Sequence, residues 1–271
     1  MKEMSGKIIL FISIIISLFI TIVSVTGLVY PDIYSKETFN WKTQSVTQDA
    51  VDLFLVMPSL MITAILAFKK NKIAGLFWSG VIFYLIYTFV IYCFALHFNR
   101  LFIVYCTTLG LGFYSFMYFL LSQIQKPIIK SVTSKSVRRT IGIYFIVISC
   151  LFYLLWLAEI VPAIINQVTP ASLIETGLLT NPVYVIDLSV CLPALFITGF
   201  LLLGKNVLGS LLTPAMLVFL ILMDLTIGAL TVLMKSKGLT GDYSVAVAMF
   251  VLALLSMVLL IWCMKHVEVV E

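Results

Sequence analysis

Long apolar runs separated by short polar segments are the main hydropathy pattern of this chain. Each run continues for about twenty residues without regular alternation, which is the length of helix needed to cross roughly 30 Å of hydrocarbon. Backbone amides in lipid must be satisfied within their own segment, so such runs are predicted to be helices and not barrel strands. We therefore predict an all-α integral membrane protein with about eight transmembrane helices. The predicted spans are residues 7–29, 50–68, 73–96, 101–122, 140–161, 183–204, 207–234 and 243–264.

The chain also contains an internal sequence repeat, in which residues 52–76 align without a gap with residues 187–211. The two stretches are identical at ten of 25 positions, including an Asp, a Pro, a Thr and a Lys-Asn pair. We call the shift that aligns Asp52 with Asp187 the repeat offset. Each copy contains four predicted spans, an even number, so both copies enter the membrane in the same orientation. Each copy also has one long predicted loop after its first span, at 30–49 or 162–182. We predict two parallel four-helix repeats related by an axis along the membrane normal. The predicted organisation is a first repeat at 1–122, a basic cytoplasmic linker at 123–139 and a second repeat at 140–271.

The first span resembles a secretory signal peptide because Lys2 and Lys7 precede its apolar core. Its apolar run exceeds twenty residues, whereas the apolar core of a signal peptide has about 7–15. Its counterpart in the repeat is the internal span at 140–161. We therefore predict that it is retained as a transmembrane helix.

Charge is scarce and unevenly distributed. Charged residues make up 11% of the chain, compared with about 25% in soluble domains. Twelve of the 17 Lys and Arg residues fall in loops on the side of the two termini, and five fall on the other side. The positive-inside rule then predicts that both termini lie in the cytoplasm. We expect the membrane to be the plasma membrane. The net charge of +5 is spread over these loops, so the lipid bilayer, and not nucleic acid, is the expected partner.

Four carboxylates fall inside predicted spans, where ionisable groups are costly and are candidates for function. They are Asp52, Asp187, Glu159 and Asp224. In the predicted orientation all four lie in the outer half of the bilayer, and no Lys or Arg lies in a span core to pair with them. Such groups favour binding of a proton or a cation. Asp224 is the strongest candidate because it is the deepest and its repeat counterpart is Phe89.

Each candidate also has a purely structural interpretation. Asp52 and Asp187 lie near predicted helix N-termini and could cap free N–H groups, Glu159 could reach water at the interface, and Asp224 could be a neutral acid bonded to a neighbouring helix. Pro58 and Pro193 lie eight and ten residues after the predicted starts of their spans, where proline kinks a helix. A kink beside an Asp could form a polar pocket between the repeats, or it could serve packing alone.

A face of the third span carries Tyr84, Thr88 and Tyr92 at four-residue spacing. Residues with this spacing lie on the same side of a helix. They could line an aqueous or aromatic binding surface, or they could pack against a neighbouring helix.

Motifs for cofactor or enzyme chemistry are missing from the sequence. The two histidines, His97 and His266, lie outside the span cores, which excludes haem ligation by two intramembrane histidines. The five cysteines form no Cys-x-x-Cys pair, and there is no zinc helix, serine elbow or P-loop. We predict no cofactor and no metal site. A lipid-modifying enzyme is a further alternative, but the sequence contains no nucleophile–base constellation that would support it.

Two functions remain open. The first is a gradient-driven transporter or permease-like protein for a cation or a proton-coupled small solute, with its site at the interface of the repeats. The second is a non-transporting membrane sensor, or an assembly subunit that binds another membrane protein.

Overall fold

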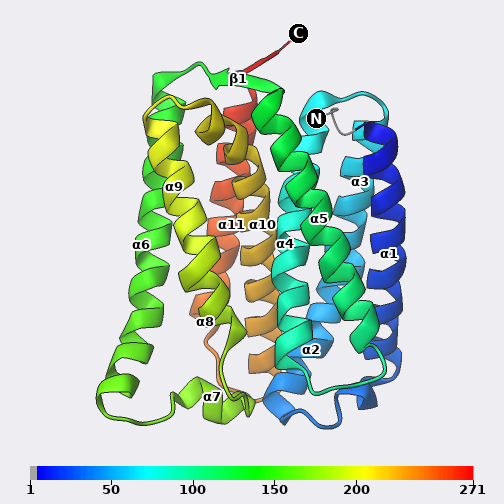
Figure 1. Cartoon of the computed structure of the whole chain (residues 1–271). Helices are drawn as coiled ribbons and strands as arrows, with labels where there is room; N and C mark the ends of the chain where they lie inside the picture. Colours follow the sequence, from blue (N-terminus) through cyan, green and yellow to red (C-terminus); the bar gives the residue numbers. More distant parts are fainter. Residues whose placement is uncertain (1–4, 271) are drawn as a thin grey trace.

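The computed structural model describes residues 5–270 and is a bundle of helices that lie roughly side by side (Figure 1). Within this part of the chain, eight helical segments are long and apolar enough to cross a membrane, and each corresponds to one predicted span. The prediction of eight apolar helices is therefore confirmed. The segments are Gly6–Val29, Phe39–Phe68, Lys72–Ala95, Phe102–Gln125, Lys135–Ile165, Pro182–Leu203, Val207–Ser236 and Tyr243–Met264.

The first four long segments occupy one side of the bundle, on the right in Figure 1. Polar side chains cap several helix starts and satisfy free backbone N–H groups there; Ser5, Thr38 and Asn71 cap α1, α2 and α4. The elements are α1 (Gly6–Val29), the 3-10 helix η1 (Pro31–Tyr34), α2 (Phe39–Val51), the π-helical turn η2 (Asp52–Val56), α3 (Met57–Phe68), α4 (Lys72–Ala95) and α5 (Phe102–Gln125).

The remaining elements form the other side of the bundle and its two ends. Ser134, Asn206 and Asp242 cap α6, α10 and α11 in the same way. The elements are β1 (Ile129–Val132), α6 (Lys135–Ile165), α7 (Ala171–Thr176), α8 (Pro182–Ile186), the π-helical turn η3 (Asp187–Cys191), α9 (Leu192–Leu203), α10 (Val207–Ser236), α11 (Tyr243–Met264) and β2 (Val267–Val269).

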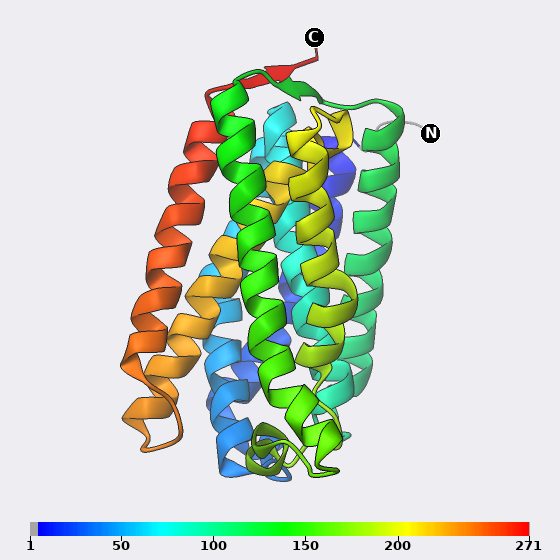
Figure 2. The same cartoon turned by 90° about the vertical axis from the view of Figure 1, so that its left-hand side faces the viewer.

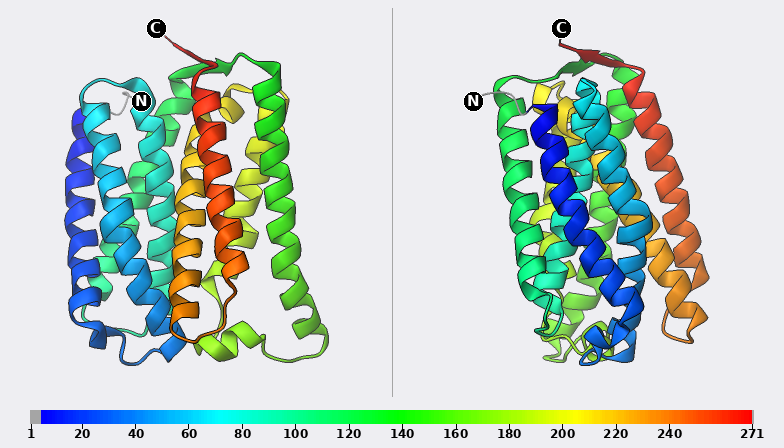
Figure 3. Two further views of the ribbon diagram at one scale, coloured as in Figure 1. Left: turned by 180° about the vertical axis from the view of Figure 1, so that it is seen from behind. Right: turned by 90° about the vertical axis from the view of Figure 1, so that its right-hand side faces the viewer.

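Helices α4 and α10 meet in the middle of the bundle, as the view from behind also shows (Figure 3). Gly80 of α4 lies against the backbone of Ala215 in α10, and a Cβ on Gly80 would lie 2.5 Å from the Ala215 carbonyl oxygen. The missing side chain lets the two helices approach closely, as small residues do in membrane helix pairs. The repeat offset relates these two contact positions to each other.

The two short strands close one end of the bundle (Figure 2). β1 and β2 pair antiparallel, with Ile129 opposite Val269 and Val132 opposite Val267. The start of α1 and the end of β2 lie at this same end (Figure 1). We call it the terminal end, and the end near α7 the distal end.

Local backbone geometry recurs at the repeat offset. Each π-helical turn begins at an aspartate, Asp52 or Asp187, and has the same length. Each is followed by a helix with proline at its second position, where the wider π turn accommodates a residue that lacks an N–H. After these helices, Lys70 and Lys205 both adopt a positive φ.

Two predicted loops contain helices. The second span begins at Phe39 and not at residue 50, so most of the predicted loop 30–49 is helical. Asp52 therefore lies well inside a continuous helical segment and cannot cap its N-terminus. The polar residues of α2 predict a loop because they lower the hydropathy of this stretch. In the structure, polar side chains such as Gln48 and Asp49 bond to tyrosines of α4. The predicted loop 162–182 likewise contains a short helix, α7, which ends at Gly177 with φ of 71°.

Candidate functional site

A cavity of about 460 Å³ lies in the distal half of the bundle, between α2, α4, α6, α7, α8, α10 and α11. This volume is in the range of cavities that hold small organic ligands, about 300–1,000 Å³. The cavity therefore lies between the two sides of the bundle, and both contribute to its lining.

The wall formed by α2 is polar. Asn40, Gln44, Ser45 and Gln48 all line the cavity. Their spacing places them on one face of the helix. The Gln44 side-chain amide donates to Asn40 Oδ1 at 2.6 Å. This face explains why a helix of low hydropathy is stable inside the bundle.

The wall formed by α6, α8 and η3 is acidic and aromatic. Trp156 Nε1 donates to Asp187 Oδ2 at 2.8 Å, and the Tyr184 hydroxyl donates to Glu159 Oε2 at 2.8 Å. The rings of Trp156 and Tyr184 are 4.9 Å apart between centroids. The backbone N–H of Ser172, in α7, donates to Glu159 Oε1 at 3.3 Å. Both carboxylates are thus held in place by neighbouring donors while they line the cavity.

The wall formed by α10 and α11 is mostly apolar. Met223, Ile227 and Leu230 lie on α10, and Met249 lies on α11. Methionine side chains are flexible and adapt to irregular shapes. The lining thus has an acidic side and an apolar side.

A chain of hydrogen bonds crosses the inner limit of the cavity. The Gln48 amide nitrogen donates to Asp52 Oδ1 at 2.9 Å and to the Tyr84 hydroxyl at 2.8 Å. The Tyr84 and Thr226 hydroxyls are 2.8 Å apart. The chain joins α2, α4 and α10, so it connects the cavity to the helices in the middle of the bundle.

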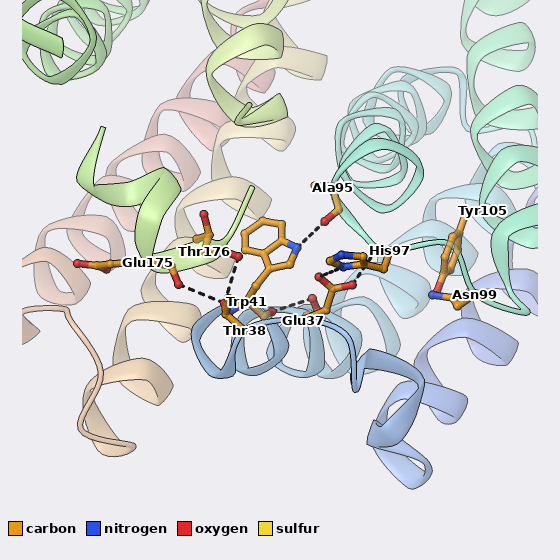
Figure 4. Close-up of polar contacts among 10 residues, drawn as sticks. Glu37, Thr38, Trp41, Ala95, His97, Asn99, Tyr105, Glu175 and Thr176 are labelled. Carbon is orange, nitrogen blue, oxygen red and sulfur yellow. Dashed lines mark hydrogen bonds and ion pairs between the residues drawn. The ribbon is translucent and has the colours of Figure 1, made fainter. Parts of the chain in front are cut away.

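The short helix α7 is held at the distal end by hydrogen bonds (Figure 4). The Thr38 hydroxyl, at the start of α2, donates to the carbonyl oxygens of Glu175 and Thr176, each at 3.1 Å. The Glu175 carboxylate also accepts from Asn40 at 3.4 Å and from Thr240 at 2.7 Å. Glu175 therefore connects α2 with the loop between α10 and α11 while it lines the cavity.

The rim beside α4 is also fixed by side-chain contacts (Figure 4). Trp41, which lines the cavity, donates its ring N–H to the Ala95 carbonyl oxygen at 2.8 Å. Glu37 accepts from the backbone N–H of His97 at 2.7 Å, and its other oxygen is 3.0 Å from His97 Nδ1. These contacts hold the start of α2 against the end of α4.

Sequence reasoning missed a fully buried carboxylate, Asp49. Its two oxygens accept from the hydroxyls of Tyr34 and Tyr92 at 2.8 Å and 2.7 Å. Burial, and then the charge of Asp49, raise the pKa of Tyr34 well above its ordinary value, so this hydroxyl remains a donor. A side chain on Gly27 of α1 would overlap the Asp49 carboxylate. Asp49 was overlooked because residues 30–49 were interpreted as a loop.

The predicted site residues fall into two groups. Asp187 and Glu159 line the cavity. Asp52 lies one hydrogen bond behind it, through Gln48, and Asp224 is not among the lining residues. Asp52 and Asp224 are both buried, and in the described part of the chain Oδ2 of each has no hydrogen-bond partner. Pro58 and Pro193 lie outside the lining, next to the π-helical turns.

The predicted face of the third span, which lies on α4, also has two roles. Tyr84, Thr88 and Tyr92 all line the cavity, and Tyr84 and Tyr92 bond to α2 residues as well. One sequence pattern could have revealed the polar wall formed by α2, because Asn40, Gln44 and Gln48 lie at four-residue spacing.

Lysine, arginine and histidine are missing from the described cavity lining, whereas Glu159, Glu175 and Asp187 are present. Among residues 5–270, no three His, Cys, Asp or Glu side chains are grouped so that they could hold a metal ion. No protein-family model, no curated protein and no solved structure matches the chain. Function is therefore inferred from the cavity and its surroundings.

Proposed function

We propose that the protein is a multi-pass protein of the plasma membrane that transports a small cationic solute, driven by a gradient. The observation that carries this proposal is the distal cavity, whose lining has three carboxylates and, among the described residues, no basic side chain. Acidic side chains in a cavity with apolar walls attract cations and raise their local concentration. The solute would enter from the distal end.

The outer surface supports insertion into a membrane. Large apolar side chains are exposed on several long helices, such as Phe11 of α1, Leu154 of α6, Phe200 of α9 and Leu254 of α11. Soluble proteins rarely expose continuous apolar surface of this kind. With both termini in the cytoplasm, as the Lys and Arg distribution predicts, the cavity would face the outside.

The matched local geometry supports a duplication into 1–122 and 140–271, joined by the linker 123–139. The π-helical turns at Asp52 and Asp187, and the helices after them, have equal lengths and are related by the repeat offset. Recurrence of an uncommon helical form at aligned positions is difficult to explain by composition.

The contact between α4 and α10 supports a two-fold axis along the membrane normal. Such an axis brings equivalent positions of two helices together, and Gly80 and Ala215 are equivalent at the repeat offset. The same axis relates two strands as an antiparallel pair, which is how β1 and β2 are arranged. The cavity would then lie between the repeats, where several transporters bind their substrates.

Roles follow for the four carboxylates. Glu159 and Asp187 would contact the solute, since both line the cavity. Asp52 and Asp224 would bind protons that couple to transport, because each is buried with one oxygen that lacks a partner among the described residues. A buried carboxylate without a counter-charge favours the uptake of a proton.

Transport can be tested with the purified protein in liposomes, by recording currents when ammonium, methylammonium, potassium or sodium is added outside. We expect a saturable current for at least one cation, which Asp187→Asn and Glu159→Gln abolish and Glu268→Gln, at the terminal end, leaves intact. Asp52→Asn and Asp224→Asn should remove its dependence on a pH gradient. Saturable binding without any current and without any proton flux across the liposome membrane would refute transport and favour the sensor.

Orientation is a separate test. Reporter fusions after Lys72 and Arg139 should be cytoplasmic, and fusions near Glu37 and Glu175 should be external. The reverse result would place the cavity on the cytoplasmic side and would refute uptake from outside.

A further inference from the structure

We infer that the cavity binds an amphipathic organic amine, with its protonated amine at the acidic wall and its apolar body against α10 and α11. This inference rests on the proposed function, because it specifies the kind of cation that the same cavity accepts. It depends on how charge, aromatic rings and apolar side chains are distributed around the cavity.

The acidic wall offers a place for one ammonium group. Asp187 and Glu159 lie on neighbouring elements, and the protein donors that hold them leave further acceptor capacity, since a carboxylate has about four lone-pair sites. A protonated amine with two or three N–H donors can use these remaining sites.

Aromatic side chains lie at this acidic wall and elsewhere in the cavity lining. Trp156 and Tyr184 are in contact and bond directly to the two carboxylates, while Tyr87 and Tyr92 line the cavity from α4. The face of an aromatic ring attracts organic cations. An ammonium with attached carbon atoms benefits from both the carboxylates and the rings.

The apolar wall formed by α10 and α11 suits the rest of such a molecule. Met223, Met234 and Met249, with the aliphatic residues between them, present a flexible apolar surface. Burying an apolar group against this surface removes it from water and therefore stabilises the complex. A bare or hydrated alkali ion would gain nothing from this wall.

Cavity size favours the same class of ligand. A volume of about 460 Å³ is much larger than a single inorganic ion needs, and it is within the range of drug-sized ligand sites. The polar wall of α2 adds hydrogen-bonding groups for a substituent between the two ends. Together these features select a molecule with a cationic head and an apolar body.

Binding can be measured by calorimetry on the full chain in lipid nanodiscs, with phenethylamine as the probe. The neutral 2-phenylethanol has nearly the same shape, and methylammonium has the charge without the ring. We expect phenethylamine to bind at least tenfold more tightly than either.

Variants locate the two ends of the probe. Asp187→Asn should weaken phenethylamine binding at least tenfold without affecting 2-phenylethanol, whereas Met249→Ala should weaken both. Glu159→Gln serves as the second acidic-wall variant if Asp187→Asn does not fold. Glu268→Gln, at the terminal end, should bind like the wild type.

The outcomes separate this inference from the proposed function. Equal binding of phenethylamine and 2-phenylethanol, or tighter binding of methylammonium, would overturn the amphipathic amine. If ammonium or sodium currents were nevertheless present in liposomes, transport of an inorganic cation would stand without this inference. Absence of binding, of current and of proton flux would refute both proposals.

Discussion

Replacing Gly80 with alanine is expected to destabilise the fold by separating the two central helices. The new Cβ would lie 2.5 Å from the Ala215 carbonyl oxygen and 2.8 Å from the Val218 Cβ. Backbone atoms cannot move aside as a flexible side chain can, so α4 and α10 must shift apart. The result tests whether close contact at this crossing holds the two sides of the bundle together.

The expected magnitude combines two opposing effects. Overpacking in a close-packed interior costs about 1–3 kcal/mol, and rigid neighbours favour the upper part of this range. Alanine also gains roughly 0.5–1 kcal/mol over glycine inside a helix. The net loss for Gly80→Ala is therefore about 2 kcal/mol, which is roughly a 30-fold change in the ratio of folded to unfolded protein.

Gly110 is a matched control for this substitution. Both glycines lie eight residues after the start of a helix of 24 residues, Gly80 in α4 and Gly110 in α5. A Cβ on Gly110 would meet no atom within 4 Å. Gly110→Ala should therefore leave the stability unchanged or raise it by up to about 1 kcal/mol.

The assay is reversible unfolding of the purified protein in mixed micelles, with the fraction of SDS increased stepwise and helicity followed by circular dichroism. The free energy of unfolding is compared for the wild type and both variants. Equal stability of Gly80→Ala and the wild type, or equal losses in both variants, would refute the reasoning from the helix crossing.

Two further pairs of variants test other parts of the fold. Asp49→Asn should lower the free energy of unfolding by about 1–3 kcal/mol, because one amide oxygen cannot accept from both tyrosine hydroxyls as the carboxylate does. Asp52→Asn should cost less in the same titration, since it keeps the oxygen that Gln48 bonds; equal losses would contradict this. Gly177→Ala should increase protease cleavage near α7, because it combines a positive φ with a Cβ placed 2.8 Å from a Thr38 methyl group. Gly238→Ala has the same φ strain in open space, so equal cleavage at both loops would exclude a role for the Thr38 contact.

The sequence alone determined the number and type of the long helices. Hydrocarbon requires every residue of a span to be compatible with lipid or with a buried partner, so hydropathy along the chain reports each crossing segment directly. The repeat also directed attention to Asp52 and Asp187, which both begin a π-helical turn. Identical residues at a fixed offset predict identical local backbone because these turns depend on nearby residues, the prolines above all.

Only the tertiary structure decided which polar residues share a cavity. Hydropathy averaged over several turns does not specify how a helix is rotated about its axis, and this rotation separates Asp187, which lines the cavity, from Asp224, which does not. The low hydropathy of α2 predicts a loop from the sequence. In the folded protein its polar side chains are stabilised by partners such as Tyr84 and Tyr92, 36 and 43 residues away in sequence. Polar groups inside a membrane protein are stabilised by contacts between distant segments, and these contacts exist only once the helices are packed.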